Sequence, residues 1–156
     1  FCDVICDLSN NNGPYDTIIG HSMGAVAALN AANMGQKFKN IILISPAAYR
    51  IEAVFRNFIS LFGLSEDIYV KSMFDSFEAR DGRKPIDYGP DKFASNVKSR
   101  CLIIHSEDDA QANSKVAEKI HEDIKDSKLM MATDLGHMRT LTDEKVIRKI
   151  GKFISS

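Results

Sequence analysis

Apolar residues follow two alternating patterns along the chain, one typical of helices and one typical of buried strands. Four of them open the chain with the i, i+3, i+4, i+7 spacing of a helix face: Phe1, Val4, Ile5 and Leu8. Short apolar or β-branched runs bounded by Gly, Pro, Asn or Ser are instead typical of strands in a parallel sheet. Such runs predict strands over residues 17–19, 41–44, 101–105 and 129–132, and the helical pattern predicts helices over residues 1–8, 25–35, 51–62, 65–80, 114–124 and 142–154.

Turn-forming and capping residues set the limits of these elements. Ser114 is predicted to begin the helix over residues 114–124, and Thr142 is predicted to cap the last helix, because a side-chain oxygen at that position can accept a free backbone N–H. Residues 81–99 are rich in Gly and Pro and are predicted to form a loop with at most a short helix. Five apolar residues of the last helix are predicted to face the core: Val146, Ile147, Ile150, Phe153 and Ile154.

Helix and strand alternate over the whole chain. This order predicts an α/β fold, with a mostly parallel sheet, right-handed crossovers and helices on both faces. We expect one domain over residues 1–156. In sheets of this kind, functional sites lie at the carboxyl ends of the strands.

A G-x-S-x-G pattern, Gly20-His21-Ser22-Met23-Gly24, lies between the first strand and the first long helix after it. A sharp strand-to-helix turn there would hold Ser22 in a strained conformation and expose its hydroxyl. We expect side chains at both glycine positions to collide with neighbouring backbone. The Met23 N–H would point at an oxygen beside Ser22. The competing interpretation is a simple turn in which Ser22 merely caps the helix.

A serine hydroxyl needs a base and an orienting acid to become a nucleophile. Candidates follow the third and fourth predicted strands, in the segments His105-Ser106-Glu107-Asp108-Asp109 and Asp134-Leu135-Gly136-His137. The chain order serine, acid, histidine is the one that accompanies a G-x-S-x-G turn. Asp108 and Asp109 both remain candidate acids, and Asp134 is a weaker one.

Together these three motifs resemble the carboxyl-terminal part of the α/β-hydrolase superfamily, in particular its serine esterases and lipases. Residues 102–109 resemble the family's strand followed by H-G-x-x-D, with Ser106 in place of the usual glycine. That match implies a Ser22–His137–Asp109 triad, with Asp109 rather than Asp108 as the acid and the Met23 N–H as one oxyanion-hole donor. It also implies an α/β-hydrolase-like sheet that lacks the family's amino-terminal strands.

The amino end departs from that family. About 20 residues precede Ser22, whereas the family usually has several strands there and takes its second oxyanion donor from one of their loops. Three alternatives would explain the missing strands: the chain is a fragment, another chain supplies the strands, or the protein is a degenerate member of the family. The absence of an initiator Met at Phe1 favours a fragment. The strand over 17–19 would then be an unpaired edge, which predicts a homodimer formed through that edge.

Residues 47–99 resemble the helical cap that relatives often insert after the second predicted strand, residues 41–44. Their aromatic stretch over 54–74 has two interpretations: a helical pair packed on the core, or a lid that lines an apolar acyl pocket. Three other histidines have structural interpretations. His21 is expected to pack inside the turn, His105 to be partly buried with satisfied nitrogens, and His121 to lie on the surface.

Composition and charge exclude some classes of binding partner and indicate the location of the protein. The 20 basic and 21 acidic residues give a net charge of −1, so we expect no nucleic-acid and no membrane partner. The three cysteines form no CxxC pair, and His105 has no second ligand at metal spacing, so we expect a reducing, cytoplasmic location and no metal site.

These observations predict a serine hydrolase that cleaves a carboxylic ester, or less readily a thioester or amide, in a small-molecule acyl substrate. The reaction would pass through an acyl-enzyme on Ser22 and would need no cofactor. Two alternatives remain open. One is a catalytically incomplete fragment or binding module. The other is an acyltransferase, although many of these have an acidic residue where this chain has Ala25.

Overall fold

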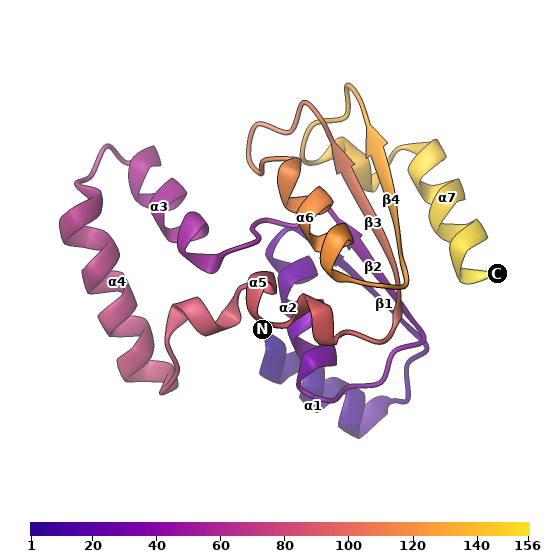
Figure 1. Cartoon of the computed structure of the whole chain (residues 1–156), viewed down its shortest axis with the longest axis horizontal. Helices are drawn as coiled ribbons and strands as arrows, with labels where there is room; N and C mark the ends of the chain where they lie inside the picture. Colours follow the sequence, from indigo (N-terminus) through magenta and orange to yellow (C-terminus); the bar gives the residue numbers. More distant parts are fainter.

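The computed structural model describes the backbone of residues 1–156 and the side chains of all of them except residues 66 and 67. Over that backbone four strands form one parallel sheet, in the order β1-β2-β3-β4 (Figure 1). The strands are β1 (Thr17–His21), β2 (Asn40–Ile44), β3 (Arg100–Ser106) and β4 (Ser127–Ala132). Each predicted strand is therefore present and is one to two residues longer than the apolar run that predicted it.

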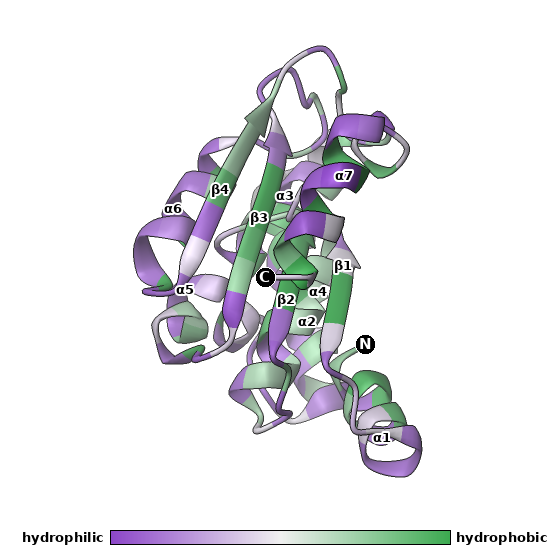
Figure 2. Ribbon diagram, turned by 90° about the vertical axis from the view of Figure 1, so that its right-hand side faces the viewer, coloured by the Kyte–Doolittle hydropathy of each residue, from purple (hydrophilic) through white to green (hydrophobic). Residues whose placement is uncertain are grey.

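The two central strands are buried on both faces, which explains why they contain almost continuous apolar sequence. Ile42 of β2 lies opposite Ile19 of β1 and Leu102 of β3. Figure 2 shows that β2 and β3 are hydrophobic over most of their length, whereas α6 (Lys115–Asp123) is mostly hydrophilic. Strand side chains alternate between faces, so each central strand contributes to two separate cores.

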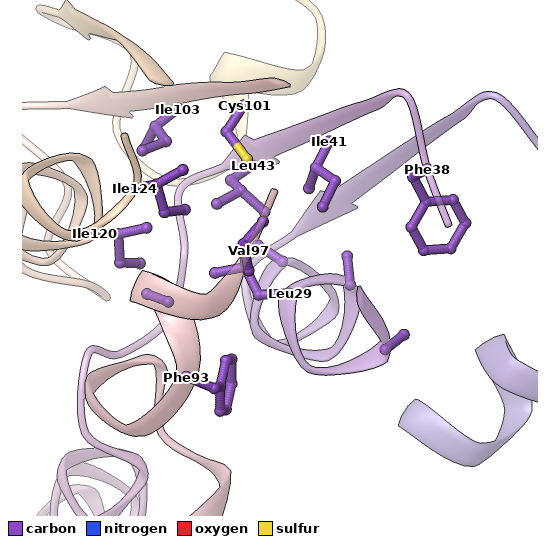
Figure 3. Packing of buried hydrophobic residues seen from close by; sticks show 14 of the residues in the cluster. Leu29, Phe38, Ile41, Leu43, Phe93, Val97, Cys101, Ile103, Ile120 and Ile124 are labelled. Carbon is purple, nitrogen blue, oxygen red and sulfur yellow. The ribbon is translucent and has the colours of Figure 1, made fainter. Parts of the chain in front are cut away.

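One core lies between the sheet and the helices that connect its strands. Leu29 of α2 (Met23–Asn33) and Ile120 of α6 pack there with Ile41, Leu43 and Ile103 of the sheet (Figure 3). Right-handed crossovers between successive neighbouring strands place their connecting helices on the same face. The predicted second layer is therefore formed by α7 (Glu144–Ile154), which follows the last strand. The second core consists of Ile42, Ile44, Leu102, Ile104, Val146 and Phe153.

The first helix, α1 (Cys2–Asn12), forms as its spacing predicts but buries little of the stripe. Ile5 and Cys6 pack against the first core, whereas Phe1, Val4 and Leu8 are exposed. No residue of α1 is fully buried in the part of the chain that the structure describes. The helix thus covers the end of α2 without contributing large side chains to the interior.

Residues 51–81 form a helical hairpin that projects from one side of the sheet (Figure 1). It consists of α3 (Ile51–Leu61) and α4 (Glu66–Asp81), whose aromatic residues pack on each other, with the rings of Phe55 and Phe74 5.2 Å apart. Ile59 and Val70 are buried in the hairpin, but Leu61 and Phe62 at its tip are 83% and 65% exposed. The first interpretation of this stretch, a helical pair packed on the main core, is therefore wrong.

The segment 81–99 is more ordered than predicted. It contains the 3-10 helix η1 (Pro85–Tyr88), the short helix α5 (Pro90–Phe93) and the 3-10 helix η2 (Ala94–Asn96). Pro85 and Pro90 each begin one of these helices. The first N–H groups of a helix have no intrahelical acceptor, so proline, which lacks an N–H, costs no hydrogen bond there. Phe93 and Ala94 return the chain to the first core.

The start of α7 corrects the predicted cap. Asp143, not Thr142, is the capping residue, and its Oδ1 accepts the N–H groups of Lys145 at 2.9 Å and Val146 at 3.0 Å. The Thr142 hydroxyl instead donates to the carbonyl of Arg139 at 3.3 Å, in the short helix η3 (Arg139–Leu141). Ile147 is 53% exposed and does not face the core as predicted.

β1 forms one edge of the sheet, so one side of its backbone has no neighbouring strand within the described chain. Ile19 in the middle of this strand is 53% exposed. Among the residues that the structure describes, none of the helices has the length and apolar character needed to cross a bilayer.

Candidate active site

Ser22 occupies the turn between β1 and α2 and has the strained backbone that the motif predicts. Its φ of 55° and ψ of −122° lie in a region that residues with side chains rarely adopt. The turn is fixed by a hydrogen bond of 3.0 Å from the Ser22 N–H to the carbonyl of Ile44, at the end of the neighbouring strand. Ser22 is the residue that precedes α2, so the helix axis begins beside its side chain.

The two glycines of the motif serve different purposes. A Cβ at Gly20 would lie 2.7 Å from the Cα of Ala25 and still closer to the carbonyl oxygen of Gly24, so the first turn of α2 can pack on β1 because Gly20 lacks a side chain. A Cβ at Gly24 would meet no atom within 4 Å among the described residues. The expected collision is therefore confirmed at Gly20 and wrong at Gly24.

An acid and a base meet at the carboxyl edge of β3 and β4, in the loops beyond their arrowheads (Figure 1). His137 Nδ1 lies 2.7 Å from Asp109 Oδ2, and both side chains are buried. The other carboxylate oxygen of Asp109 accepts the backbone N–H groups of Gln111 at 2.8 Å and Ala112 at 2.9 Å. Burial raises the pKa of Asp109, but the donors from His137, Ala112 and Gln111 outweigh it, so the pKa lies below its ordinary value. The carboxylate is thus ionised and fixed in orientation.

Asp108, the rival acid, has a different set of partners. Its Oδ1 accepts the Ser106 hydroxyl and, at 3.2 Å, the Gly136 N–H. These two donors lower the pKa of Asp108. Ser106 Oγ in turn accepts the Leu135 N–H at 3.2 Å. Asp108 and Ser106 therefore tie the acid loop to the histidine loop, and the serine that replaces the family's glycine has this bridging role.

Asp134, the weaker candidate acid, belongs to the turn that presents His137. It has a φ of 62°, and Gly136, also in that turn, has a φ of 56°. Two left-handed residues in three positions reverse the chain after β4. Asp134 is exposed, unlike the buried side chain of Asp109.

His21 connects the serine turn to the histidine loop. Its Nε2 lies 3.0 Å from the carbonyl oxygen of His137, and the centroids of the two imidazole rings are 4.7 Å apart. Thr140 Oγ1 donates to the same carbonyl at 2.9 Å and lies 3.3 Å from Ser45 Oγ, which follows β2. Among the described side chains, no hydrogen bond joins Ser22 Oγ to His137. The serine and the imidazole therefore lie on the same sheet edge, joined through the residue next to Ser22.

His105, at the end of β3, differs from its predicted role. It is fully buried rather than partly buried, and its Nδ1 has no partner among the described atoms. Its Nε2 lies 3.0 Å from the Ala112 carbonyl and 3.2 Å from Asp109 Oδ2. His121 is half-buried rather than exposed and pairs with Ser127 Oγ at 2.6 Å.

A cavity of about 290 Å³ lies beside the serine turn, between α1, α2 and the α3–α4 hairpin. Its apolar wall includes Met23, Val26, Val54, Phe55 and Phe77. Near its rim, Asp81 pairs with Arg83 at 3.4 Å and accepts the Tyr88 hydroxyl. This wall places the hairpin over a pocket that begins at Met23, the residue after Ser22.

The start of α2 offers a backbone donor for an oxyanion. The Met23 N–H lies in the first turn of α2, where backbone N–H groups have no intrahelical acceptor and the helix dipole favours negative charge. In the described part of the chain, no group of three or more His, Cys, Asp or Glu side chains has the arrangement to hold a metal ion.

Comparisons with solved structures identify the fold. An esterase from Exiguobacterium antarcticum superposes with a TM-score of 0.73 at 17% identity, covering 99% of this chain and 72% of the esterase. An esterase from Rhodococcus gives 0.67 at 15% identity, covering 99% and 70%. An esterase from Pyrococcus furiosus gives 0.66 at 20% identity, covering 97% and 58%. At these identities the likeness shows an α/β-hydrolase fold.

Sequence comparison identifies the family directly. No curated protein matches the chain significantly. Residues 7–144, however, match the model of the serine hydrolase family, and this range includes the serine turn, the acid loop and the histidine loop. The chain therefore belongs to the serine hydrolase family, within the α/β-hydrolase superfamily.

Proposed function

We propose that this chain hydrolyses a carboxylic ester through an acyl-enzyme on Ser22, with His137 as base and Asp109 as the orienting acid. The observation that carries the proposal is the 2.7 Å contact between His137 Nδ1 and Asp109 Oδ2, on the sheet edge where Ser22 has its strained backbone. Because Nδ1 carries the proton that faces the carboxylate, Nε2 is the basic nitrogen that can accept the serine proton.

The reaction then proceeds in two halves. Ser22 Oγ forms a bond to the ester carbonyl carbon while its proton moves to His137 Nε2, and the resulting oxyanion accepts the Met23 N–H. The C–O bond to the alcohol breaks as His137 returns the proton to the leaving oxygen. Water, deprotonated by His137, attacks the acyl carbon in the same way and releases the acid and Ser22. Asp109 stays ionised throughout and stabilises the imidazolium.

The cavity beside Met23 supports a substrate with a small or medium apolar acyl group. Its volume of about 290 Å³ and its wall of Val, Met and Phe side chains suit such a group. We propose that the α3–α4 hairpin, within a cap of residues 47–99, acts as the lid of this pocket. Thioesters and amides present the same carbonyl chemistry and are secondary substrates in the proposal.

The test combines a fluorophosphonate probe with nitrophenyl esters of increasing acyl length. Wild type is expected to be labelled and to turn over the esters, with a preference for short or medium chains. Ser22→Ala should abolish both, whereas Ser60→Ala, which removes an exposed serine of α3, should leave both unchanged. Labelling that persists in Ser22→Ala would contradict the assignment of the nucleophile.

A second candidate, a catalytically incomplete module of the same fold, has one observation in its favour. Within the described residues, the Met23 N–H is the donor that we can assign to the oxyanion, and loss of one donor typically costs roughly 10²–10³ in rate. Labelling without measurable turnover would favour this candidate. Turnover that requires an added alcohol or thiol would favour the acyltransferase alternative instead.

A further inference from the structure

His105 contacts the acid loop at two points with one nitrogen. Nε2 lies 3.0 Å from the carbonyl of Ala112 and 3.2 Å from Asp109 Oδ2. The second of these atoms is the oxygen that receives His137 Nδ1 at 2.7 Å. Asp109 Oδ2 therefore lies between two imidazole rings, one from the end of β3 and one from the loop after β4.

The proton on the His105 ring can be placed from its neighbours. Both atoms near Nε2 are acceptors, a carbonyl and a carboxylate, so Nε2 must carry a hydrogen. Nδ1 is buried without a partner among the described atoms, which is costly for a protonated and charged nitrogen. Burial lowers the pKa of His105, an effect that the Ala112 carbonyl and Asp109 partly offset. The ring is thus neutral, with its hydrogen on Nε2.

The same nitrogen also fixes the shape of the acid loop. Ala112 is bonded at both ends of its backbone, since its N–H donates to Asp109 Oδ1 at 2.9 Å and its carbonyl accepts from His105. These bonds close the turn that begins at Asp109 and hold it against β3. The side chain of His105 is fully buried, so the ring has little freedom to leave this position.

We infer that His105 is a positioning residue for the reaction: its Nε2–H holds the Asp109 carboxylate, directly and through the Ala112 carbonyl, in the orientation that receives His137 Nδ1. This inference rests on the proposed function of the Ser22 site. It assigns His105 no contact with the substrate and no proton transfer.

Loss of the Nε2 donor has a distinct electrostatic consequence. The titratable groups that face His105 are Asp109 and His137. With one donor fewer, the Asp109 carboxylate attracts a protonated His137 ring more strongly. The acidic limb of the pH profile of kcat/KM reports protonation of the essential base, so its midpoint should move to higher pH. A purely structural role for His105 would lower stability and leave this midpoint unchanged.

The experiment compares four proteins: wild type, His105→Phe, His105→Gln and His121→Gln. Phenylalanine keeps the ring and removes the donor, whereas the side-chain amide of glutamine can place an N–H near the position of Nε2. For His105→Phe we expect kcat to fall about 10-fold, KM to change by less than about two-fold, and the acidic midpoint to rise by about half a pH unit. Glutamine should restore most of kcat and the wild-type midpoint. His121→Gln controls for loss of a histidine elsewhere.

A second measurement keeps the inference separate from the proposed function. The NMR signal of the proton between His137 Nδ1 and Asp109 can be followed with pH in the Ser22→Ala background, which needs no turnover. We expect this titration to move to higher pH in His105→Phe and to stay near wild type in His105→Gln. His105→Met, which also lacks the donor, is used if His105→Phe does not fold.

The two experiments distinguish failure of the inference about His105 from failure of the proposed function. An unshifted titration in the donor-free variant, or an equal shift in the glutamine variant, would overturn the positioning role of His105. Absence of wild-type turnover would instead overturn the proposed esterase function, and the NMR titration would still decide the role of His105.

Discussion

Three side chains from three different segments contact His137, one at its ring and two at its backbone carbonyl. Asp109 contacts its ring, while His21 and Thr140 contact its carbonyl at 3.0 and 2.9 Å. The order serine, acid, histidine and the strand-end placement predicted that an acid lies beside His137, without deciding between Asp108 and Asp109. The sequence could not predict the contact from His21 to the carbonyl, because it depends on how two segments 116 residues apart approach each other.

The choice between Asp108 and Asp109 illustrates the same limit. Neighbouring acids at a strand end are equivalent in composition, and the resemblance to a known motif favoured Asp109. The structure separates them by geometry, since Asp109 receives His137 while Asp108 receives Ser106 and Gly136. The full burial of His105 depends on how the acid loop and the histidine loop close over the end of β3, which the sequence pattern does not show.

At the residue scale we predict that stability falls as the pH falls below the ordinary histidine value. Burial lowers the pKa of His105, so below about 6.5 the unfolded chain binds a proton that the folded chain refuses. The free energy of unfolding should then decrease with falling pH, by up to about 1.4 kcal/mol per pH unit for this one group. Below the folded-state pKa, both states carry the proton and the slope ends.

Urea unfolding of wild type and His105→Gln at several pH values between 5 and 7.5 measures this contribution. The variant should show a flatter dependence, whereas His121→Gln should retain the wild-type slope. Equal slopes in wild type and His105→Gln would show that the buried ring does not resist protonation.

At the scale of elements, the packing of α2 on β1 depends on one glycine of the serine turn. Gly20→Ala would place a Cβ 2.7 Å from the Cα of Ala25, and the overlap involves backbone that cannot rotate away. We expect a loss of about 1–3 kcal/mol in unfolding free energy and a loss of probe labelling, because the turn that presents Ser22 must shift.

Gly24→Ala is the matched control, since its added Cβ meets no described atom within 4 Å. It should unfold near the wild-type denaturant concentration and should be labelled normally. A result in which both alanine variants behave alike would contradict the different roles assigned to the two glycines. The sequence motif treats these positions identically, and the open space around Gly24 is visible in the structure alone.

The cap of α7 provides a second test at this scale. Asp143→Ala removes the oxygen that accepts the N–H groups of Lys145 and Val146, and should cost about 1 kcal/mol. Thr142→Ala, at the position that the sequence pattern favoured, should cost less than about 0.5 kcal/mol. Chemical unfolding measures both, and a larger loss in Thr142→Ala would contradict the assigned cap. Both residues are good capping types, so composition could not decide between them.

Element existence was predictable from periodicity, whereas the exposed face of an element was less so. The strands and the long helices were found where apolar patterns predicted them. The prediction that Ile147 faces the core was wrong because adjacent apolar residues can face either way, and the outcome depends on the neighbour that the helix packs against. The departure of the α3–α4 hairpin from the main core has the same cause.

At the scale of the whole molecule, β1 leaves one side of its backbone unpaired within the described chain. An unpaired strand edge with an exposed apolar residue favours pairing with another strand. We predict a homodimer through this edge, and Ile19→Lys should shift it towards monomer because charged edge residues oppose such pairing. Sedimentation velocity over a range of concentrations measures this, and wild type that stays monomeric at high concentration would contradict it.

The measurement that most directly tests the account is rapid quenching of the reaction with a nitrophenyl ester, followed by intact-mass and peptide mass spectrometry. We predict a species heavier than the free chain by one acyl group, with the added mass on the peptide that contains Ser22 and absent in Ser22→Ala. Ester turnover with no acylated chain, or with the acyl group on another residue, would contradict the assignment of Ser22 as the nucleophile.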